Sequence, residues 1–193
     1  MYYIIELMYI NSFIKLKKKL IEKNNLPKSF LKFEFSHFNF IDHKKFISLR
    51  NKKNVSKFFF NPNKISLKNH YKYLANYNSK PILNLVLITK RSKKIVGNFS
   101  IKKTVIGYEI GKMILNNKYL CKGIARQGSI KLLEYYFKYI KERKILSKTK
   151  INNRANINLN TKLGFIISKK NNDYYIMELS YVRFHNFCYK KKF

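Results

Sequence analysis

The feature that most constrains this chain is a β-rich segment followed by a short loop and a long amphipathic helix, over residues 105–140. The segment VIGYEIGKMIL is rich in β-branched residues and predicts a strand. A second strand at residues 145–151 then completes a β-α-β crossover, which should be right-handed. From Gly123 onward, apolar residues recur at helical spacing for over four turns and predict one continuous helix. The positions on this stripe are Ile124, Gly128, Leu132, Leu133, Tyr136, Phe137 and Ile140.

Further strand patterns predict a mixed α/β sheet instead of a doubly wound parallel one. Residues 33–41 alternate with aromatic side chains on both faces, which predicts a strand buried on one side and partly covered on the other. β-rich runs flank the basic turn Lys90–Lys94 and predict a hairpin, and a last hairpin is expected across Asn171–Asn172. Because hairpins join antiparallel neighbours, most of the sheet should be antiparallel.

Three more helices are expected beside the long one. The first begins at Asp42, a good N-cap residue, and runs to about Asn51. The second covers ISLKNHYKYLANY, is capped by Ser66 and carries one apolar stripe. The third covers NNRANINLNTKLGF and stops at Gly164, which supplies the residue just after the helix.

The length of 193 residues and the hydrophobic content of 46% predict one domain with a substantial core. We expect this domain over residues 31–180, with an N-terminal extension at 1–30 and a basic C-terminal tail at 181–193. The apolar N-terminal stretch contains Glu6 and precedes its lysine cluster, which is the wrong order for a signal peptide. It is too short for a membrane span, so we expect an amphipathic helix or strand appended to the domain.

The chain is strongly basic, with 42 Lys and Arg residues against 9 Asp and Glu and a formal net charge of +33. One interpretation is a nucleic-acid partner. The favoured alternative is compositional drift, because Lys, Asn, Ile, Phe and Tyr are all over-used and the basic residues are spread along the whole chain. Under either interpretation the surface will attract anions, including a negatively charged substrate or cofactor.

Cysteine and histidine give no sign of a metal site. The two cysteines, Cys121 and Cys188, form neither a zinc pattern nor a disulfide framework. The four histidines lack the spacing of metal ligands. We therefore expect no metal and a reduced, cytoplasmic location.

The loop before the long helix is a candidate phosphate site. Backbone N–H groups at a helix N-terminus are unsatisfied and carry partial positive charge, and Gly123 lets an anion approach without a Cβ in the way. The segment is neither a Walker loop nor a dinucleotide-binding fingerprint, because the spacing of those motifs is absent. On these residues alone, a plain strand-to-helix turn remains the alternative.

Two segments resemble the motifs of the GNAT superfamily of N-acetyltransferases. YEIGKMILNNKYLCKGIARQGSIKLLEYYF is similar to its acetyl-CoA-binding motif, and NRANINLNTKLGF is similar to its second motif. One helix and one strand separate them, as in that superfamily, and the similarity runs from about Ile95 to Leu179. The resemblance implies a mixed, mostly antiparallel central sheet flanked by helices, with acetyl-CoA as the acetyl donor.

The same resemblance implies which residues hold acetyl-CoA, mainly through backbone amides. Where the family usually has Arg or Gln and then Gly before the Lys-Gly pair, this chain has Leu120 and Cys121. The side chain of Lys122 or Arg126 can add positive charge to the loop. The implied cofactor contacts are Met113, Ile114, Leu115, Lys122, Gly123, Ile124, Ala125, Arg126 and Asn153.

Two candidate catalytic residues follow from the resemblance. Many family members place a Tyr near the CoA thiolate as general acid, and Asn160 stands at that position here. Asn can donate a hydrogen bond but cannot deliver a proton. Glu109, on the strand before the loop, is the candidate base for the acceptor amine, and a carboxylate paired with a lysine is its alternative role. The end of that strand would offer the N–H of Met113 or Ile114 to the thioester carbonyl.

The segment LRNKKNVSKFFFNPNKISLKNHYKYL resembles a GNAT branch that acetylates UDP-linked 4-amino-dideoxy sugars of pseudaminic-acid type. The resemblance implies that Arg50, Phe59, Phe60 and His70 line the acceptor pocket. For the phenylalanines and His70, burial in the core is the alternative. The implied reaction is direct transfer to a primary amine without a covalent enzyme intermediate. Two further possibilities stay open: an N-terminal acetyltransferase of ribosomal or other proteins, and a non-catalytic basic RNA-associated protein.

Overall fold

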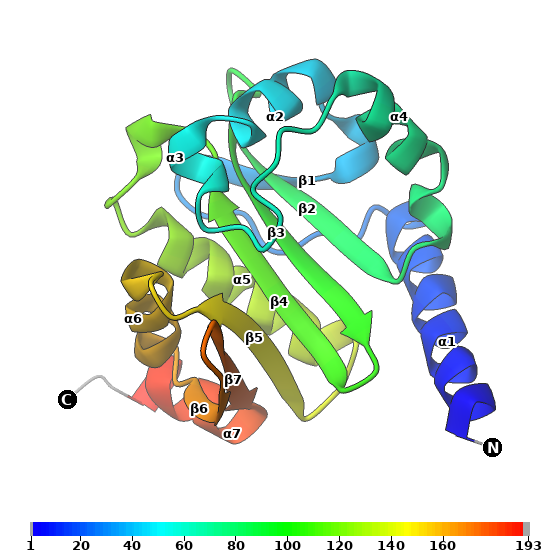
Figure 1. The fold of residues 1–193 in the computed structure, drawn as a ribbon, viewed down its shortest axis with the longest axis vertical. Coiled ribbons are helices and arrows are strands. Elements are labelled where there is room, and N and C mark those ends of the chain that lie inside the picture. The colour runs from blue at the N-terminus through cyan, green and yellow to red at the C-terminus, as the bar shows by residue number, and fades with distance from the viewer. Residues whose placement is uncertain (1, 191–193) are drawn as a thin grey trace.

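A seven-stranded sheet organises the chain, in the order β1-β2-β3-β4-β5-β7-β6 (Figure 1). The computed structural model describes residues 2–190. Within this range β4 and β5 are the only neighbouring strands that run parallel, so the predicted mixed and mostly antiparallel sheet is confirmed. The strands are β1 (Phe33–His37), β2 (Ile82–Thr89), β3 (Ile95–Thr104), β4 (Gly107–Ile114), β5 (Lys144–Lys150), β6 (Ile166–Lys170) and β7 (Tyr174–Ser180).

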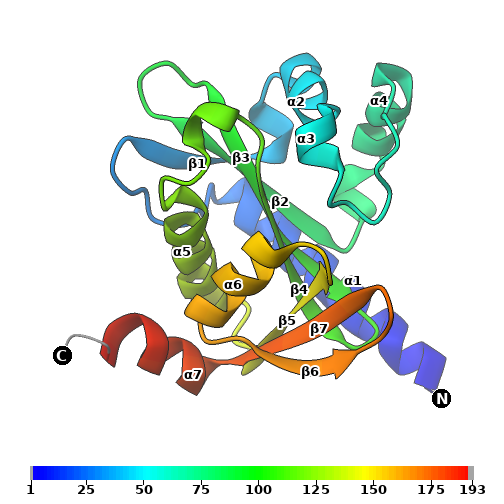
Figure 2. The same ribbon diagram turned by 60° about the vertical axis from the view of Figure 1, so that its left-hand side comes forward.

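Helices cover both faces of the sheet and bury two hydrophobic clusters (Figures 1 and 2). One cluster lies under α1, α5, α6 and α7, and the other lies under α2, α3 and α4. Short single-turn segments occur at Phe38–Phe40, Tyr77–Ser79, Asn117–Tyr119 and Asn186–Lys190. The helices are α1 (Tyr2–Glu22), α2 (His43–Arg50), α3 (Lys53–Ser56), α4 (Leu67–Ala75), α5 (Ile124–Tyr139), α6 (Arg154–Lys162) and α7 (Tyr181–His185).

The predicted helix ends are confirmed in atomic detail. The Asp42 carboxylate accepts the Lys45 N–H at 2.9 Å at the start of α2. The Ser66 hydroxyl accepts the Asn69 N–H at 3.2 Å at the start of α4. Gly164 follows the C-cap of α6 with a φ of +94°, which glycine adopts more readily than other residues.

The strand predicted over residues 33–41 is shorter than expected. β1 ends at His37, and a single 3-10 turn follows at Phe38–Phe40. That turn carries Phe38 into the cluster under α2 and α4, where its ring packs edge-on against Phe46, and leaves Phe40 70% exposed. The aromatics that suggested a strand buried on one side and partly covered on the other therefore belong to a strand followed by a turn.

Helix α5 lies very close to the sheet because of one glycine. A Cβ on Gly128 would come within 2.5 Å of the Phe99 ring on β3. An alanine there would force the ring or the helix to move. Gly128, which the sequence places on the apolar face of the long helix, thus serves close packing.

The first and the last described α-helices pack onto the core. Helix α1 buries Phe13 and Leu20, and the amine of Lys17 donates to the backbone carbonyls of Tyr77, Lys80 and Ile82. In α7, Phe184 is buried in the same cluster as α5. None of the described helices combines the length and apolar character that crossing a bilayer requires.

Candidate active site

The sheet opens between β4 and β5. Over the described residues these parallel strands pair at one position only, Glu109 opposite Leu146, whereas β3 and β4 pair along the whole length of β4. Beyond Glu109 the strands diverge, and α6 and the N-terminus of α5 lie beside this end of them (Figure 2). An unpaired inner strand edge leaves backbone N–H and C=O groups free to bind an extended ligand.

Backbone alternation shows which groups face this gap. The N–H of Leu115 donates to the Val96 carbonyl at 2.9 Å, so residues 115 and 113 direct their backbone toward β3. The backbone N–H and C=O groups of Lys112 and Ile114 must therefore point toward β5. Of the two N–H groups predicted for the thioester carbonyl, Ile114 therefore has the suitable direction. Leu115 is fully buried and its N–H is already used.

The loop before α5 has the shape that an anion site needs. Gly123 is the N-cap of α5 with a φ of +71°, and a Cβ built on it would meet no atom within 4 Å. The space above its backbone is therefore open, and the first N–H groups of α5 lie at the end of a 16-residue helix. Cys121, two residues earlier, also has a positive φ of +55°.

The other residues predicted to bind the cofactor lie in the loop, in the first turn of α5 and at the start of α6. The Lys122 side chain is exposed in the loop, and Arg126 is partly buried on the first turn of α5. Ile124 is buried, and Ala125 accepts the Ser129 hydroxyl through its carbonyl. Asn153 caps α6 by accepting the Asn156 N–H at 3.2 Å. The loop residues and the gap-facing residues of β4 are close in sequence, whereas Asn153 caps α6.

Asn160 connects the two diverging strands. It is fully buried on α6, and its amide nitrogen donates to Ser147 Oγ at 3.0 Å and Thr149 Oγ1 at 3.3 Å, both on β5. Its Oδ1 accepts a hydrogen bond of 2.5 Å from the amine of Lys112 on β4. The position predicted to replace the family's tyrosine is thus a bridge across the gap.

Sequence reasoning missed Lys112, a partly buried lysine whose amine contacts Asn160. Its side chain lies on the apolar face of β4 that also carries Tyr108 and Ile110, and its burial lowers the pKa of its amine to about 7. The Phe165 ring lies 5.8 Å from the nitrogen. The sequence did contain a signal for this residue, because Lys112 stands at an inward-facing position of a predicted strand. A buried lysine is rare and often has a function.

Glu109 lies on the opposite face of β4, the face covered by α2, α3 and α4. Burial raises the pKa of its carboxyl group, and the nearby Lys102 and Lys148 oppose this shift. A partly buried carboxylate with a raised pKa suits a general base near neutral pH. Glu109 and Asn160 therefore approach the gap from its two sides.

Lys148 on β5 lies beside aromatic side chains on the same face as Glu109. Its amine lies 3.8 Å from the Tyr174 ring centre and 4.7 Å from that of Phe60, which is 51% exposed. Lys150 lies 5.9 Å from the Phe60 ring. The structure thus joins predicted Phe60 to two lysines and a tyrosine that the sequence had not singled out.

Arg50 and Phe59 lie deeper under the same loop. The Arg50 guanidinium stacks 4.7 Å from the Phe59 ring and donates to the carbonyls of Asn61 and Asn63. Its side chain is buried, so here it holds loop 57–65 in place. A direct contact of these two residues with the acceptor stays a prediction.

His70 is 4% exposed within the aromatic cluster under α2 and α4. Its Nε2 lies 3.1 Å from His43 Nδ1, and its ring stacks on Phe46 and Tyr73. Burial first, and then the neighbouring His43, lower the pKa of His70 to about 4. The structure places it in a different cluster from Phe60, and its predicted role in acceptor binding is untested.

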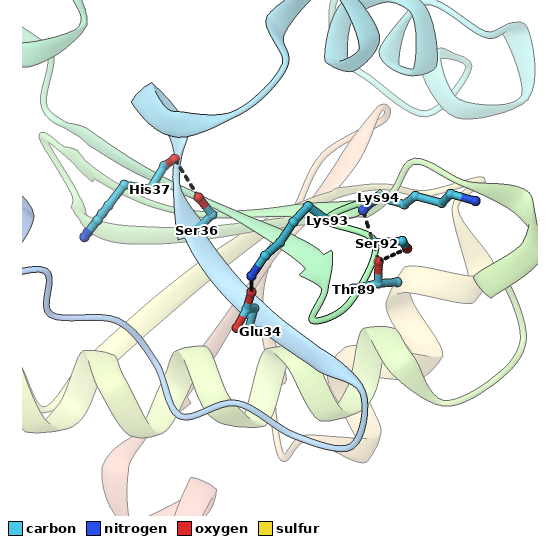
Figure 3. Close-up of polar contacts among 7 residues, drawn as sticks. All are labelled: Glu34, Ser36, His37, Thr89, Ser92, Lys93 and Lys94. Atoms are coloured by element: carbon cyan, nitrogen blue, oxygen red, sulfur yellow. Dashed lines mark hydrogen bonds and ion pairs between the residues drawn. The ribbon is translucent and has the colours of Figure 1, made fainter.

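A broad groove of about 1110 Å³ runs along β1 and reaches the loop at Asn116 and Tyr119. Figure 3 shows the polar contacts that border it, including the Glu34–Lys93 ion pair and the Thr89–Ser92 hydroxyl pair. Among the described residues, none of its lining comes from β4, β5, α5 or α6. The groove is therefore separate from the gap.

The mixed sheet, the gap between β4 and β5 and the loop before α5 are together typical of an N-acetyltransferase. Comparison with known proteins supports this class. A family model described as an acetyltransferase (GNAT) domain matches residues 33–166. The chain belongs to the GNAT family. No curated protein sequence matches it.

Several solved structures are similar in fold. An acetyltransferase (GNAT family) from Bacillus anthracis is 20% identical, with a TM-score of 0.69 over 80% of this chain and 98% of that one. The spermidine N-acetyltransferase from Vibrio cholerae, solved with CoA and spermine, is 17% identical, with a TM-score of 0.67 over 80% and 99%. The Campylobacter jejuni N-acetyltransferase PseH is 16% identical, with a TM-score of 0.61 over 78% and 99%.

Proposed function

We propose that this protein transfers the acetyl group of acetyl-CoA directly to a primary amine on an anionic acceptor, the 4-amino group of a UDP-linked amino-dideoxy sugar. The class of acceptor is inferred from a surface of lysines and aromatic rings that lies on the same face of the sheet as Glu109. This surface is formed by Phe60, Lys148, Lys150 and Tyr174. We call these four residues the acceptor surface.

The residues of the gap and loop fit acetyl-CoA. The open space above Gly123 and the N-terminus of α5 suit a pyrophosphate, and Lys122 adds positive charge nearby. The gap-facing N–H groups of Lys112 and Ile114 suit the carbonyl groups of an extended pantetheine arm. When bound, acetyl-CoA supplies the activated acyl group, and this chain binds it, orients it and handles the protons.

The charge of the acceptor surface argues against a polyamine, although a structural neighbour is a spermidine N-acetyltransferase. A polycation needs several carboxylates, whereas Glu109 here is accompanied by Lys102, Lys148 and Lys150. The net charge of +33 repels polycations at longer range as well. The lysines instead suit phosphate oxygens, and the two rings suit a base or a sugar face.

Direct transfer is consistent with the thiols of the chain. Cys121 is exposed in the loop assigned to pyrophosphate. Cys188 is partly buried, and its burial raises the pKa of its thiol, which disfavours the nucleophilic thiolate. The acceptor amine itself is therefore the attacking group, with Glu109 accepting its proton.

The acceptor is tested by measuring acetyl transfer to three substrates: a UDP-linked 4-amino-dideoxy sugar, spermidine and an N-terminal peptide. We expect the nucleotide sugar to give the highest kcat/KM. Lys148→Met should lower that kcat/KM by about tenfold or more, because a charged hydrogen bond to phosphate is worth roughly 1.5–3 kcal/mol. Lys144→Met, an exposed lysine on the same strand, is the matched control and should have no effect. Turnover of spermidine or peptides alone would contradict the proposal.

A protein N-terminus is the second candidate acceptor, and the basic surface is compatible with work near the ribosome. Preferred turnover of the peptide would favour it. Salt-sensitive binding to arbitrary RNA without any acetyl transfer would instead favour a non-catalytic RNA-associated protein.

A further inference from the structure

The amine of Lys112 occupies the place where the two strands diverge. It hydrogen bonds to Asn160, which is held in turn by Ser147 and Thr149 of β5. This four-residue bridge joins β4, α6 and β5 over the gap. The nitrogen is therefore fixed at one point beside the edge of β4 that faces the gap.

We infer that Lys112 is the catalytic acid that protonates the sulfur of the CoA leaving group, with Asn160 as its positioning residue. This inference rests on the proposed function, because it requires acetyl-CoA in the gap. It also accounts for an asparagine at position 160, since the amide needs only to hold the amine of Lys112.

The assigned step balances in atoms and protons. The amine nitrogen of the acceptor forms a bond to the acetyl carbon, and the carbon–sulfur bond breaks with its electron pair on sulfur. Glu109 accepts a proton from the acceptor nitrogen on one face of the sheet. Lys112 donates a proton to sulfur on the other face. The products are the N-acetylated acceptor and the CoA thiol, and solvent restores both side chains.

The acidity of Lys112 matches this task. Its burial lowers the pKa of the amine to about 7, whereas a thiol has a pKa of about 8.5. Proton transfer from the ammonium to a thiolate is therefore favourable. An ordinary lysine, with a pKa of about 10.4, would be a weaker acid than the thiol it serves.

The groups around Lys112 are uncharged. Asn160 and Phe165 contact it, Ser147 and Thr149 lie behind Asn160, and Met177 of β7 touches the same amide. The buried titratable groups on this face of β4 and α5 include Tyr108, Tyr135 and Tyr136, and burial raises the pKa of all three phenols. Glu109, Lys102 and Lys148 belong to the opposite face. Desolvation therefore sets the acidity of Lys112.

The first experiment measures Lys112 itself, without turnover. In protein labelled with ¹³C at lysine Cε, the resonance missing from Lys112→Met identifies Lys112. We expect it to titrate near pH 7 in the wild type. In Asn160→Asp the added carboxylate should move this titration to higher pH. A Lys112 resonance that titrates near the ordinary lysine value of about 10.4 would overturn the inference.

The second experiment measures turnover with a saturating acceptor. Loss of a general acid should lower kcat of Lys112→Met about 100-fold or more, with a small change in KM for acetyl-CoA. In the wild type kcat should fall as pH rises through the pKa of Lys112, because only the protonated amine donates. This fall of kcat at high pH should be absent in Lys112→Arg, because its guanidinium stays protonated. Lys144→Met should match the wild type.

The outcomes separate this inference from the proposed function. If the wild type neither binds CoA nor transfers acetyl groups, both fail. If it does both while Lys112→Met keeps the wild-type kcat and pH profile, only the role of Lys112 fails. Acetylation of Lys112 during turnover would identify it as a nucleophile and also overturn the acid role.

Discussion

Cys121 is the residue at which this chain departs most visibly from the family pattern, and the structure shows how its backbone is affected. The family usually has a glycine there, and the backbone of Cys121 keeps the left-handed conformation that glycine favours, with a φ of +55°. A non-glycine residue pays about 1–2 kcal/mol for that conformation. The loop geometry is therefore retained although the favoured residue has been lost.

Cys121→Gly should raise the free energy of unfolding by up to about 1 kcal/mol, since relief of the backbone conformation exceeds the added entropy of the unfolded chain. Cys121→Val should lower it, because β-branched residues tolerate positive φ poorly. Chemical denaturation of the three proteins measures the difference. A valine variant as stable as the glycine variant would show that the conformation is not strained.

His70 predicts how stability depends on pH. The pKa of His70 is about 4 in the folded protein, below its ordinary value of 6.5, so between these values the unfolded chain binds more protons. The free energy of unfolding should therefore fall as pH decreases from 6.5 to 4, by at most about 3.4 kcal/mol from this residue. His37 and His43, whose pKa values are also lowered by burial, add in the same direction.

Denaturation at a series of pH values tests this effect. His70→Phe should flatten the dependence between pH 6.5 and 4. The same slope in His70→Phe and the wild type would show that His70 does not remain neutral in the fold.

Among the elements, helix α1 is held by a buried lysine. Lys17 is fully buried, and its amine donates to three backbone carbonyls around Tyr77–Ser79 and the start of β2. The apolar residues Phe13 and Leu20 pack on either side of it along the helix. This contact attaches residues 13–20 of α1 to the folded unit.

Lys17→Met should lower the free energy of unfolding by about 2–3 kcal/mol, because it leaves buried carbonyls without donors. Amide exchange should become faster in α1 before it does so in the central strands. Lys15→Met, on the exposed side of the same helix, is the matched control. Equal exchange in both variants would contradict the role of Lys17 as the anchor of α1.

The elements also show how far the sequence predicts this molecule. Local signals such as the Asp42 and Ser66 caps, Gly164 and the stripe of α5 predicted elements correctly, because each depends on nearby residues. The turn at Phe38–Phe40 and the contacts of Lys112 with Asn160 depend on residues far apart in the sequence. A strand pattern cannot distinguish a residue that faces a gap from one that faces a closed core.

Across the whole molecule, charge and shape act together. With 42 basic residues and 9 acidic ones, the surface attracts anions, and the strands β4 and β5 leave an opening where we propose that one of them binds. Three of the carboxylates, Glu34, Glu134 and Glu178, are engaged in ion pairs with lysines. A strongly anionic donor such as acetyl-CoA, with its phosphates at the N-terminus of α5, fits this distribution.

Binding of acetyl-CoA, measured by calorimetry and by thermal denaturation, tests the central claim most directly. At 100 times its Kd, acetyl-CoA should stabilise the wild type by about 2.7 kcal/mol. Gly123→Glu should abolish the effect, because it places bulk and negative charge in the loop. Val105→Glu, which adds the same charge on the exposed β3–β4 turn, should retain it. Millimolar acetyl-CoA that leaves the wild type unchanged, or that stabilises Gly123→Glu equally, would contradict the account.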